Sequence, residues 1–234
     1  MSKQFELPHF KYVPNAYELG LFSKESFTCE ICNSEQKYRY IGPVYMENES
    51  STGTYKVTNT EHKICAFCIE NGMAADQLNA DFKDIDILEQ SCYNKEHIDE
   101  EKCDAVIHTW LYKTPNFRGL ETELWPICCS NFTSFIGYLG SGEMSARQFN
   151  LNEDYKPSEL TAELEGKTID NLFKNLDAAL ELESKRLREN GIKVKNGKEL
   201  SDILKDEESN AVGYLFKCID CNKYRVHVDF VRKE

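Results

Sequence analysis

The chain has 234 residues, 41% of them hydrophobic and 29% charged, and it carries a net charge of −12. These values are typical of a globular protein and exclude a fully disordered chain, and no run of about 18 apolar residues offers a membrane span. The negative field would repel a nucleic-acid backbone and attract a basic partner. Because the first residues lack the apolar core of a signal peptide, we expect a cytoplasmic protein.

The N-terminal half is predicted to contain an aromatic arm, short strands and a helix. Residues 5–22 hold many aromatic residues and two prolines, which favours an extended arm. Residues 37–46 and 54–58 have the β-branched and aromatic content of strands. Residues 69–90 carry a mixed helical pattern that begins directly after a cysteine pair.

An acidic segment overlaps the end of that helical pattern. Residues 76–104 hold ten acidic side chains and three lysines. Their net charge of −7 is more than half of the net charge of the chain, −12. Such a segment is either a solvated surface or a docking face that steers a basic protein into contact. The docking interpretation assigns partner binding to Asp81, Asp84, Asp86, Glu89, Asp99, Glu100 and Glu101.

The C-terminal half combines a buried stretch with a helix and a final hairpin. Residues 105–140 are the most apolar part of the chain, and residues 141–167 are polar. We therefore expect a cysteine-rich, zinc-binding region over 1–140, and over 141–234 a helix and a cysteine-containing β-hairpin that packs on the same core.

Two elements of this half are well defined by their patterns. Residues 168–190 have one apolar face and begin at Thr168, a favourable N-cap residue, which predicts one helix. In the last strand, 226–231, valines and Phe230 alternate with His227 and Asp229, so we expect one face to be buried.

Ten cysteines give the strongest chemical signal in the chain. In a reducing cytosol, such a number indicates metal ligands or reactive thiols rather than disulfides. Six of them form Cys-x-x-Cys pairs, a spacing that lets one tight turn point two thiolates at the same tetrahedral ion. These pairs are Cys29/Cys32, Cys65/Cys68 and Cys218/Cys221.

The first and third pairs share a local pattern. Each is followed by an asparagine, Asn33 or Asn222, and then by a strand-like run. Asparagine tolerates the left-handed backbone that such a turn needs. A turn of this kind, a hairpin and a second pair at a helix start together predict an α+β fold with a zinc-stabilised β lobe, either a zinc ribbon or a treble clef.

We expect one Cys₄ zinc site from the first two pairs, Cys29, Cys32, Cys65 and Cys68; the alternative is two unrelated pairs of buried thiols. A four-thiolate site is usually structural because it leaves no coordination position for a substrate. For Cys218 and Cys221 the best candidate partners are Cys128 and Cys129, although adjacent cysteines often point in different directions. The alternative for that adjacent pair is a role as small buried core residues.

Short motifs along most of the chain carry a family resemblance. They are Leu7-Pro8-His9-Phe10, Cys29-x-x-Cys32, Gly42-Pro43-Val44-Tyr45, Cys65-x-Phe67-Cys68, Thr114-Pro115-x-Phe117, Trp125-Pro126-x-x-Cys129, Phe135-Ile136-Gly137-Tyr138 and Tyr214-Leu215-Phe216-Lys217-Cys218-x-x-Cys221. Together they resemble the CbrC family, bacterial proteins linked to colicin tolerance. The family has a His-Cys pair where this chain has Cys128 and Cys129, and a later Cys where it has Thr133.

The resemblance implies a protein that protects bacteria from a toxin. With the acidic charge, it leads us to expect a non-enzymatic immunity protein that binds and neutralises a cognate toxin domain, such as a nuclease with a basic cleft. The alternative is a zinc-containing or thiol-dependent enzyme that uses Cys128, Cys129 or the last pair; the chain contains none of the common nucleophile-elbow, Walker, dinucleotide or zincin motifs. A nucleic-acid-binding zinc module is disfavoured by the charge.

Overall fold

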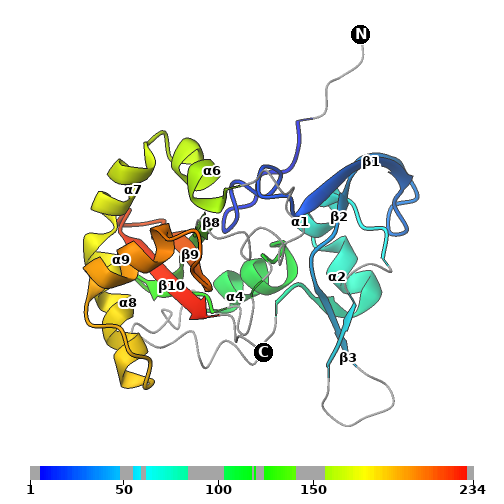
Figure 1. Cartoon of the computed structure of the whole chain (residues 1–234). Helices are drawn as coiled ribbons and strands as arrows, with labels where there is room; N and C mark the ends of the chain where they lie inside the picture. The colour runs from blue at the N-terminus through cyan, green and yellow to red at the C-terminus, as the bar shows by residue number, and fades with distance from the viewer. Residues whose placement is uncertain are drawn as a thin grey trace. The chain divides into compact units, whose positions relative to one another are not determined.

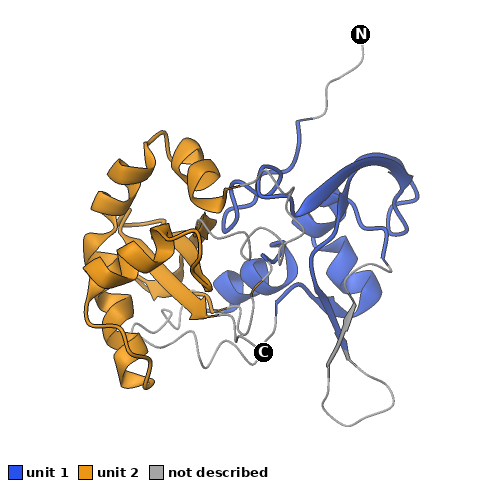
Figure 2. Cartoon of the chain, in the orientation of Figure 1, with its two compact units in different colours: residues 1–118 blue, residues 119–234 orange. Residues whose placement is uncertain are grey.

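A computed structural model of the chain describes residues 6–47, 55–58, 62–83, 103–117, 119, 124–140 and 156–230, with the backbone alone at residues 47, 55–58 and 103. The chain divides into two compact units, residues 1–118 and 119–234 (Figure 1, Figure 2). Helices and small antiparallel sheets occur in both units, so the expected mixture of helix and sheet is confirmed.

The first unit is built on two small antiparallel sheets. Strands β1 (Phe22–Thr28) and β2 (Glu35–Tyr40) form a hairpin, and β3 (Val44–Glu47) pairs with β4 (Tyr55–Thr58) on one side and β5 (Ala80–Asp81) on the other. The helices among the described residues of this unit are α1 (Ala66–Glu70), α2 (Met73–Leu78) and α4 (Cys103–Tyr112).

The segment before β1 is not the extended arm that the sequence predicts. Residues 11–20 form successive turns, in which the N–H of Ala16 donates to the carbonyl of Val13 and the N–H of Leu19 to that of Asn15. The turns bury Phe10 and Tyr12 to 2% and 0% exposure. Burial of aromatic surface on the unit therefore outweighs the extended preference of the two prolines.

The second unit contains a three-stranded antiparallel sheet with helices packed against it. The sheet has the order β10–β9–β8, and a two-stranded sheet β6–β7 precedes it in the chain. The strands are β6 (Ile127–Cys128), β7 (Asn131–Phe132), β8 (Ser134–Leu139), β9 (Ala211–Lys217) and β10 (Tyr224–Phe230), and the helices are α6 (Pro157–Leu164), α7 (Ile169–Asn175), α8 (Asp177–Glu189) and α9 (Gly197–Lys205). Among the described residues of the whole chain, no helix is long and apolar enough to cross a membrane.

One apolar cluster joins the helices of this unit to its sheet. Leu180 of α8 and Leu200 of α9 pack with Leu215 of β9 and Val228 of β10, all of them almost fully buried. The single helix expected over 168–190 is divided at Leu176, where α7 ends and α8 begins. Thr168 caps α7 as predicted, because its side chain accepts a hydrogen bond from the N–H of Asn171.

The outer edge of β10 is covered by charged side chains of α8. The carboxylate of Glu183 accepts a hydrogen bond of 2.8 Å from the N–H of Val228, and it is paired with Arg186 at 2.6 Å. His227 and Asp229 are also buried, at 4% and 8% exposure, so the polar face of this strand is buried as well. The alternation of residues predicted the apolar face but gave no sign of the partners that cover the other one.

The division of the chain at residue 140 stays a prediction, and the two compact units are residues 1–118 and 119–234. Long-range strand pairing holds the second unit together. Strand β8 pairs with β9 along Ser134–Lys217 to Leu139–Gly213, which draws the segment before residue 140 into the unit that holds the last hairpin.

Candidate metal centres

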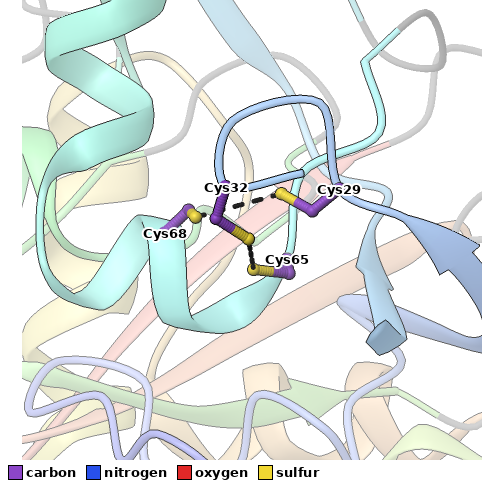
Figure 3. Close-up of side chains that lie close together, drawn as sticks. All are labelled: Cys29, Cys32, Cys65 and Cys68. Carbon is purple, nitrogen blue, oxygen red and sulfur yellow. Dashed lines mark hydrogen bonds between the residues drawn. The ribbon is translucent and has the colours of Figure 1, made fainter. Parts of the chain in front are cut away.

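The first cluster of cysteines lies in the first unit and joins a hairpin turn to the start of a helix. Cys29 and Cys32 lie on the turn between β1 and β2, while Cys65 precedes α1 and Cys68 lies in its first turn. Their sulfurs lie within 4.8 Å of one another, with 3.9 Å between Cys29 and Cys68 and 3.9 Å between Cys32 and Cys65. Figure 3 shows the two pairs facing each other from these two segments.

Backbone hydrogen bonds shape the turn that carries the first pair. The N–H of Cys29 donates to the carbonyl of Ser34 at 3.0 Å, and the N–H of Asn33 returns to the carbonyl of Cys29 at 2.9 Å. Asn33 has a φ of 54°, the left-handed conformation expected for this position. The turn therefore holds both sulfurs on the side of the hairpin that faces α1.

A short ladder brings the second pair alongside this hairpin. The N–H of Glu30 donates to the carbonyl of Lys63 at 3.0 Å, and the N–H of Tyr40 donates to that of Ile64 at 2.9 Å. The backbones of Arg39 and Cys65 pair as an isolated antiparallel β-bridge. These bonds fix the chain immediately before α1. The 32 residues between the two pairs are therefore no obstacle to one shared site.

The second cluster lies in the second unit and joins two turns. Cys218 and Cys221 lie on the turn between β9 and β10, while Cys128 ends β6 and Cys129 begins the turn from β6 to β7. All four sulfurs lie within 4.8 Å of one another, with 3.7 Å between Cys128 and Cys221 and 4.0 Å between Cys128 and Cys129. The structure thus brings together all eight cysteines for which the sequence predicted a metal role, in two groups of four.

The turn at Cys218 repeats the hydrogen bonds of the turn at Cys29. The N–H of Cys218 donates to the carbonyl of Lys223 at 2.8 Å, and the N–H of Asn222 donates to that of Cys218 at 3.0 Å. Asn222 has a φ of 58°, close to that of Asn33. The similarity of the two sequence motifs therefore reflects one local backbone structure used twice.

The backbone of the β6–β7 turn explains how two adjacent cysteines reach one cluster. In a regular strand, neighbouring side chains point to opposite faces. Here Cys129 and Ser130 have φ angles of 53° and 57°, and Cys128 pairs with Asn131 across the tight turn. The left-handed backbone at Cys129 redirects its side chain, so both sulfurs lie in the same group.

Arg225 is a neighbour of the second cluster that the sequence analysis missed. Its guanidinium lies 3.2 Å from the sulfur of Cys128, close enough to stabilise negative charge there. The signal was present in the sequence, because Arg225 lies four residues after Cys221 in the strand that leaves the turn. Its orientation toward the sulfurs depends on the pairing of β9 and β10.

When no ion is bound, the sulfurs of each cluster have pKa values shifted in opposite directions. A hydrogen bond from Cys65 lowers the pKa of Cys29 to about 4, while burial raises the pKa of Cys68 to about 12. In the second cluster, burial raises the pKa of Cys128, and a backbone hydrogen bond from Lys223 lowers the pKa of Cys221 to about 7. A bound divalent cation would favour the thiolate form of all four sulfurs in a cluster, because it stabilises the four negative charges together.

The spacing of the sulfurs fits a tetrahedral ion. Four sulfurs at about 2.3 Å from a zinc ion lie about 3.8 Å from one another. In each cluster all sulfurs lie within 4.8 Å of one another, and two pairs in each are separated by 3.7–4.0 Å. A disulfide requires about 2.05 Å, so these pairs are not disulfides, and all eight cysteines are free. Both groups of four therefore have the donor set and the spacing of a metal site.

Of the seven acidic residues expected to bind a partner, the structure describes one, Asp81. Asp81 lies in β5, where it is half-buried and its pKa is raised to about 6 by burial. The other six, Asp84, Asp86, Glu89, Asp99, Glu100 and Glu101, lie outside the described residues. His62, close to Cys65 in sequence, pairs with Glu30 at 2.7 Å.

These features define the class of the protein as a two-unit chain with a candidate tetrathiolate metal centre in each unit. The chain belongs to the uncharacterised protein family UPF0167, whose model matches residues 7–180. The match includes the first cluster, Cys128 and Cys129, and it ends before Cys218. No solved structure matches the chain.

Curated relatives extend the similarity beyond the family match. UPF0167 protein Mb2317 of Mycobacterium bovis is 24% identical over 228 residues, which are 96% of this chain and 94% of the relative. UPF0167 protein PA1536 of Pseudomonas aeruginosa is 28% identical over 138 residues, 59% of this chain and 67% of the relative. The assignment to the CbrC family is therefore corrected, because both the family model and these relatives are UPF0167 proteins.

Proposed function

We propose that this chain is a zinc protein with two structural tetrathiolate sites, and that the folded protein acts by binding another macromolecule rather than by catalysis. The observation that carries the proposal is the geometry of the cysteines. Eight of them form two groups of four whose sulfurs lie within 4.8 Å of one another, and the separations of 3.7–4.0 Å in two pairs of each group match those around one tetrahedral ion.

Zinc is the preferred ion for such sites in a reducing compartment. Tetrahedral sites of four thiolates select zinc or iron, and zinc undergoes no redox change. The turn, hairpin and helix start of the first cluster resemble a treble clef. Because zinc contributes about 10–16 kcal/mol in small zinc modules, while a whole domain is stable by only about 5–15 kcal/mol, we expect each unit to depend on its ion.

Elemental analysis of the purified protein tests this proposal. We expect two zinc ions per chain, and one ion in each of the double variants Cys65→Ser/Cys68→Ser and Cys218→Ser/Cys221→Ser. The control is Cys92→Ser/Cys103→Ser, which changes cysteines outside both clusters and should retain two ions. Wild-type protein without zinc, or two ions in either cluster variant, would contradict the proposal.

The nature of the partner follows from charge. The chain has 40 acidic and 28 basic side chains, and the segment 76–104 concentrates the acidic ones. We propose a basic protein partner, and the expectation of a toxin domain neutralised by occlusion remains a specific form of this proposal. Its support is the charge alone, since UPF0167 carries no statement of function.

Charge reversal tests the acidic segment directly. The variant Asp99→Lys/Glu100→Lys/Glu101→Lys should abolish binding to, and protection from, the toxin domain encoded by a neighbouring gene, because the steering charge is inverted. The matched control is Asp202→Lys/Glu207→Lys/Glu208→Lys, which reverses three exposed charges in and after α9. If the wild-type protein neither binds nor neutralises that toxin, the toxin proposal fails.

A thiol-dependent enzyme is the second candidate, and the exposure of Cys129 and Cys221 favours it. A bound ion opposes it, because all four thiolates would already be ligands. Turnover of an added disulfide substrate by the zinc-loaded protein would favour the enzyme, and turnover only after chelation would favour the structural role.

A further inference from the structure

The two cysteine clusters differ in the exposure of their residues. In the first cluster, Cys29, Cys65 and Cys68 are 0%, 1% and 1% exposed, and Cys32 is half-buried. In the second cluster, Cys128 and Cys218 are buried, whereas Cys129 and Cys221 are exposed. A reagent dissolved in water therefore reaches two residues of the second cluster directly.

This exposure is a property of the backbone turns. Cys129 has a left-handed φ of 53° at the tip of the β6–β7 turn, and Cys221 lies immediately before Asn222, whose φ is 58°. The N–H of Cys221 also donates to the sulfur of Cys218 at 3.4 Å, which holds the turn around the cluster. Because tight turns fix these positions, a change of side-chain rotamer would not bury them.

We propose that the second cluster is a redox modification site, at which a peroxide oxidises the exposed Cys221, a disulfide with Cys128 follows, and the metal ion is released. This inference rests on the zinc sites proposed above and adds a modification to one of them. The rate of thiol oxidation depends on thiolate character and on access. Ligation makes the sulfurs of both clusters thiolates, so the difference in access decides which cluster reacts first.

The chemistry proceeds in two balanced steps. The thiolate of Cys221 attacks one oxygen of the peroxide, the O–O bond breaks, and Cys221 becomes a sulfenic acid while the leaving hydroxide takes a proton from the buffer and becomes water. A second thiolate then attacks the sulfenic sulfur and forms a disulfide, and the oxygen leaves as hydroxide, which takes a second proton from the buffer and becomes the second water. Two thiolates have lost one electron each, the peroxide has been reduced to two waters, and the divalent ion has lost two ligands.

The sulfur separations identify the disulfide. The sulfur of Cys128 lies 3.7 Å from that of Cys221, so a small movement of the two turns joins them. A bond between Cys128 and Cys129 is disfavoured, because adjacent Cα atoms are about 3.8 Å apart and disulfides usually need about 4.4–6.8 Å. The disulfide therefore links the β6–β7 turn to the β9–β10 turn in place of the ion.

The experiment uses zinc-loaded full-length protein that carries the substitutions Cys92→Ser/Cys103→Ser, which remove the thiols outside the clusters. Hydrogen peroxide is added in steps while a chromogenic chelator records released zinc, and mass spectrometry maps the oxidised cysteines. We expect the first equivalent of zinc to leave at least about tenfold faster than the second, together with a Cys128–Cys221 disulfide. Dithiothreitol and one equivalent of zinc should restore the starting state.

The outcomes separate this inference from the proposed function. Protein purified without zinc would overturn the proposed function and this inference with it. Two zinc ions that leave together, that leave first from the cluster of Cys29, or that resist peroxide entirely would overturn the redox site alone. The two structural zinc ions would then still stand.

Discussion

Arg225 shows how one residue can distinguish two chemically similar sites. With the proposed zinc ion bound, a tetrathiolate centre would carry two net negative charges, and the guanidinium 3.2 Å from Cys128 would offset part of that charge at the second cluster. Groups that contact metal ligands commonly change metal affinity by about 10–100-fold when they are removed.

The variant Arg225→Met should therefore weaken zinc binding at the second site by about tenfold or more, while the affinity of the first site is unchanged. Competition with a zinc chelator of known affinity measures both sites. Lys223→Met is the matched control, since it removes an exposed charge from the same turn and keeps the backbone carbonyl that accepts from Cys218. An equal loss of affinity in both variants would show that general charge, not this contact, is responsible.

Asn222 supplies the backbone conformation on which the second turn depends. A left-handed backbone costs most residues about 1–2 kcal/mol, and glycine adopts it without that cost. Asn222→Ala should therefore lower the free energy of unfolding of the zinc-loaded protein by about 1 kcal/mol, whereas Asn222→Gly should leave it nearly unchanged. Denaturant titration in excess zinc measures both variants, and equal stability of the Ala and Gly forms would contradict this role.

At the scale of elements, the packing of α8 against the edge of β10 depends on a buried carboxylate. Glu183 is 4% exposed and accepts from both Arg186 and the N–H of Val228. Removal of one partner from a buried pair typically costs about 3–5 kcal/mol. The substitution Glu183→Gln should therefore lower the free energy of unfolding by several kcal/mol, as measured by denaturant titration. The control Glu189→Gln breaks an exposed pair with Lys185 in the same helix, and it should cost less than about 1 kcal/mol.

The same carboxylate predicts a pH dependence. Burial raises the pKa of Glu183, but hydrogen bonds from Arg186 and His227 outweigh burial and hold its pKa below the usual value. A carboxylate with a lowered pKa stabilises the fold above the pKa of the unfolded state, and this stabilisation is lost as the pH falls through the folded pKa. The difference in unfolding free energy between the wild-type protein and Glu183→Gln should therefore shrink below about pH 4.3. A difference that grows in acid would contradict the assignment.

At the scale of the whole molecule, local patterns predicted the turns and the candidate partners of each cysteine pair, but not the strand pairing that brings them together. The spacing of Cys29/Cys32 and Cys218/Cys221, with an asparagine after each, was enough to predict two similar turns, because that geometry is determined within five residues. Cys128 and Cys129 were the expected partners of Cys218, and the meeting of strands β6, β7 and β9 is what places them beside it. Arg225 was missed, and the helix break at Leu176 was not predicted, for the same reason.

Burial of polar residues was also beyond local patterns. His227 and Asp229 alternate with valines, yet both are buried, because α8 covers the edge of β10 with Glu183 and Arg186. Alternation reports which side of a strand is apolar, and it carries no information on a distant helix that supplies charges to the other side. The boundary at residue 118 likewise follows from the pairing of β8 with β9.

X-ray absorption at the zinc edge, recorded on the purified full-length protein with its metal content measured in parallel, tests the central claim most directly. The account predicts two zinc ions per chain and a single shell of four sulfur neighbours at about 2.3 Å. Nitrogen or oxygen neighbours in place of sulfur, or a protein that folds with no bound metal, would contradict it.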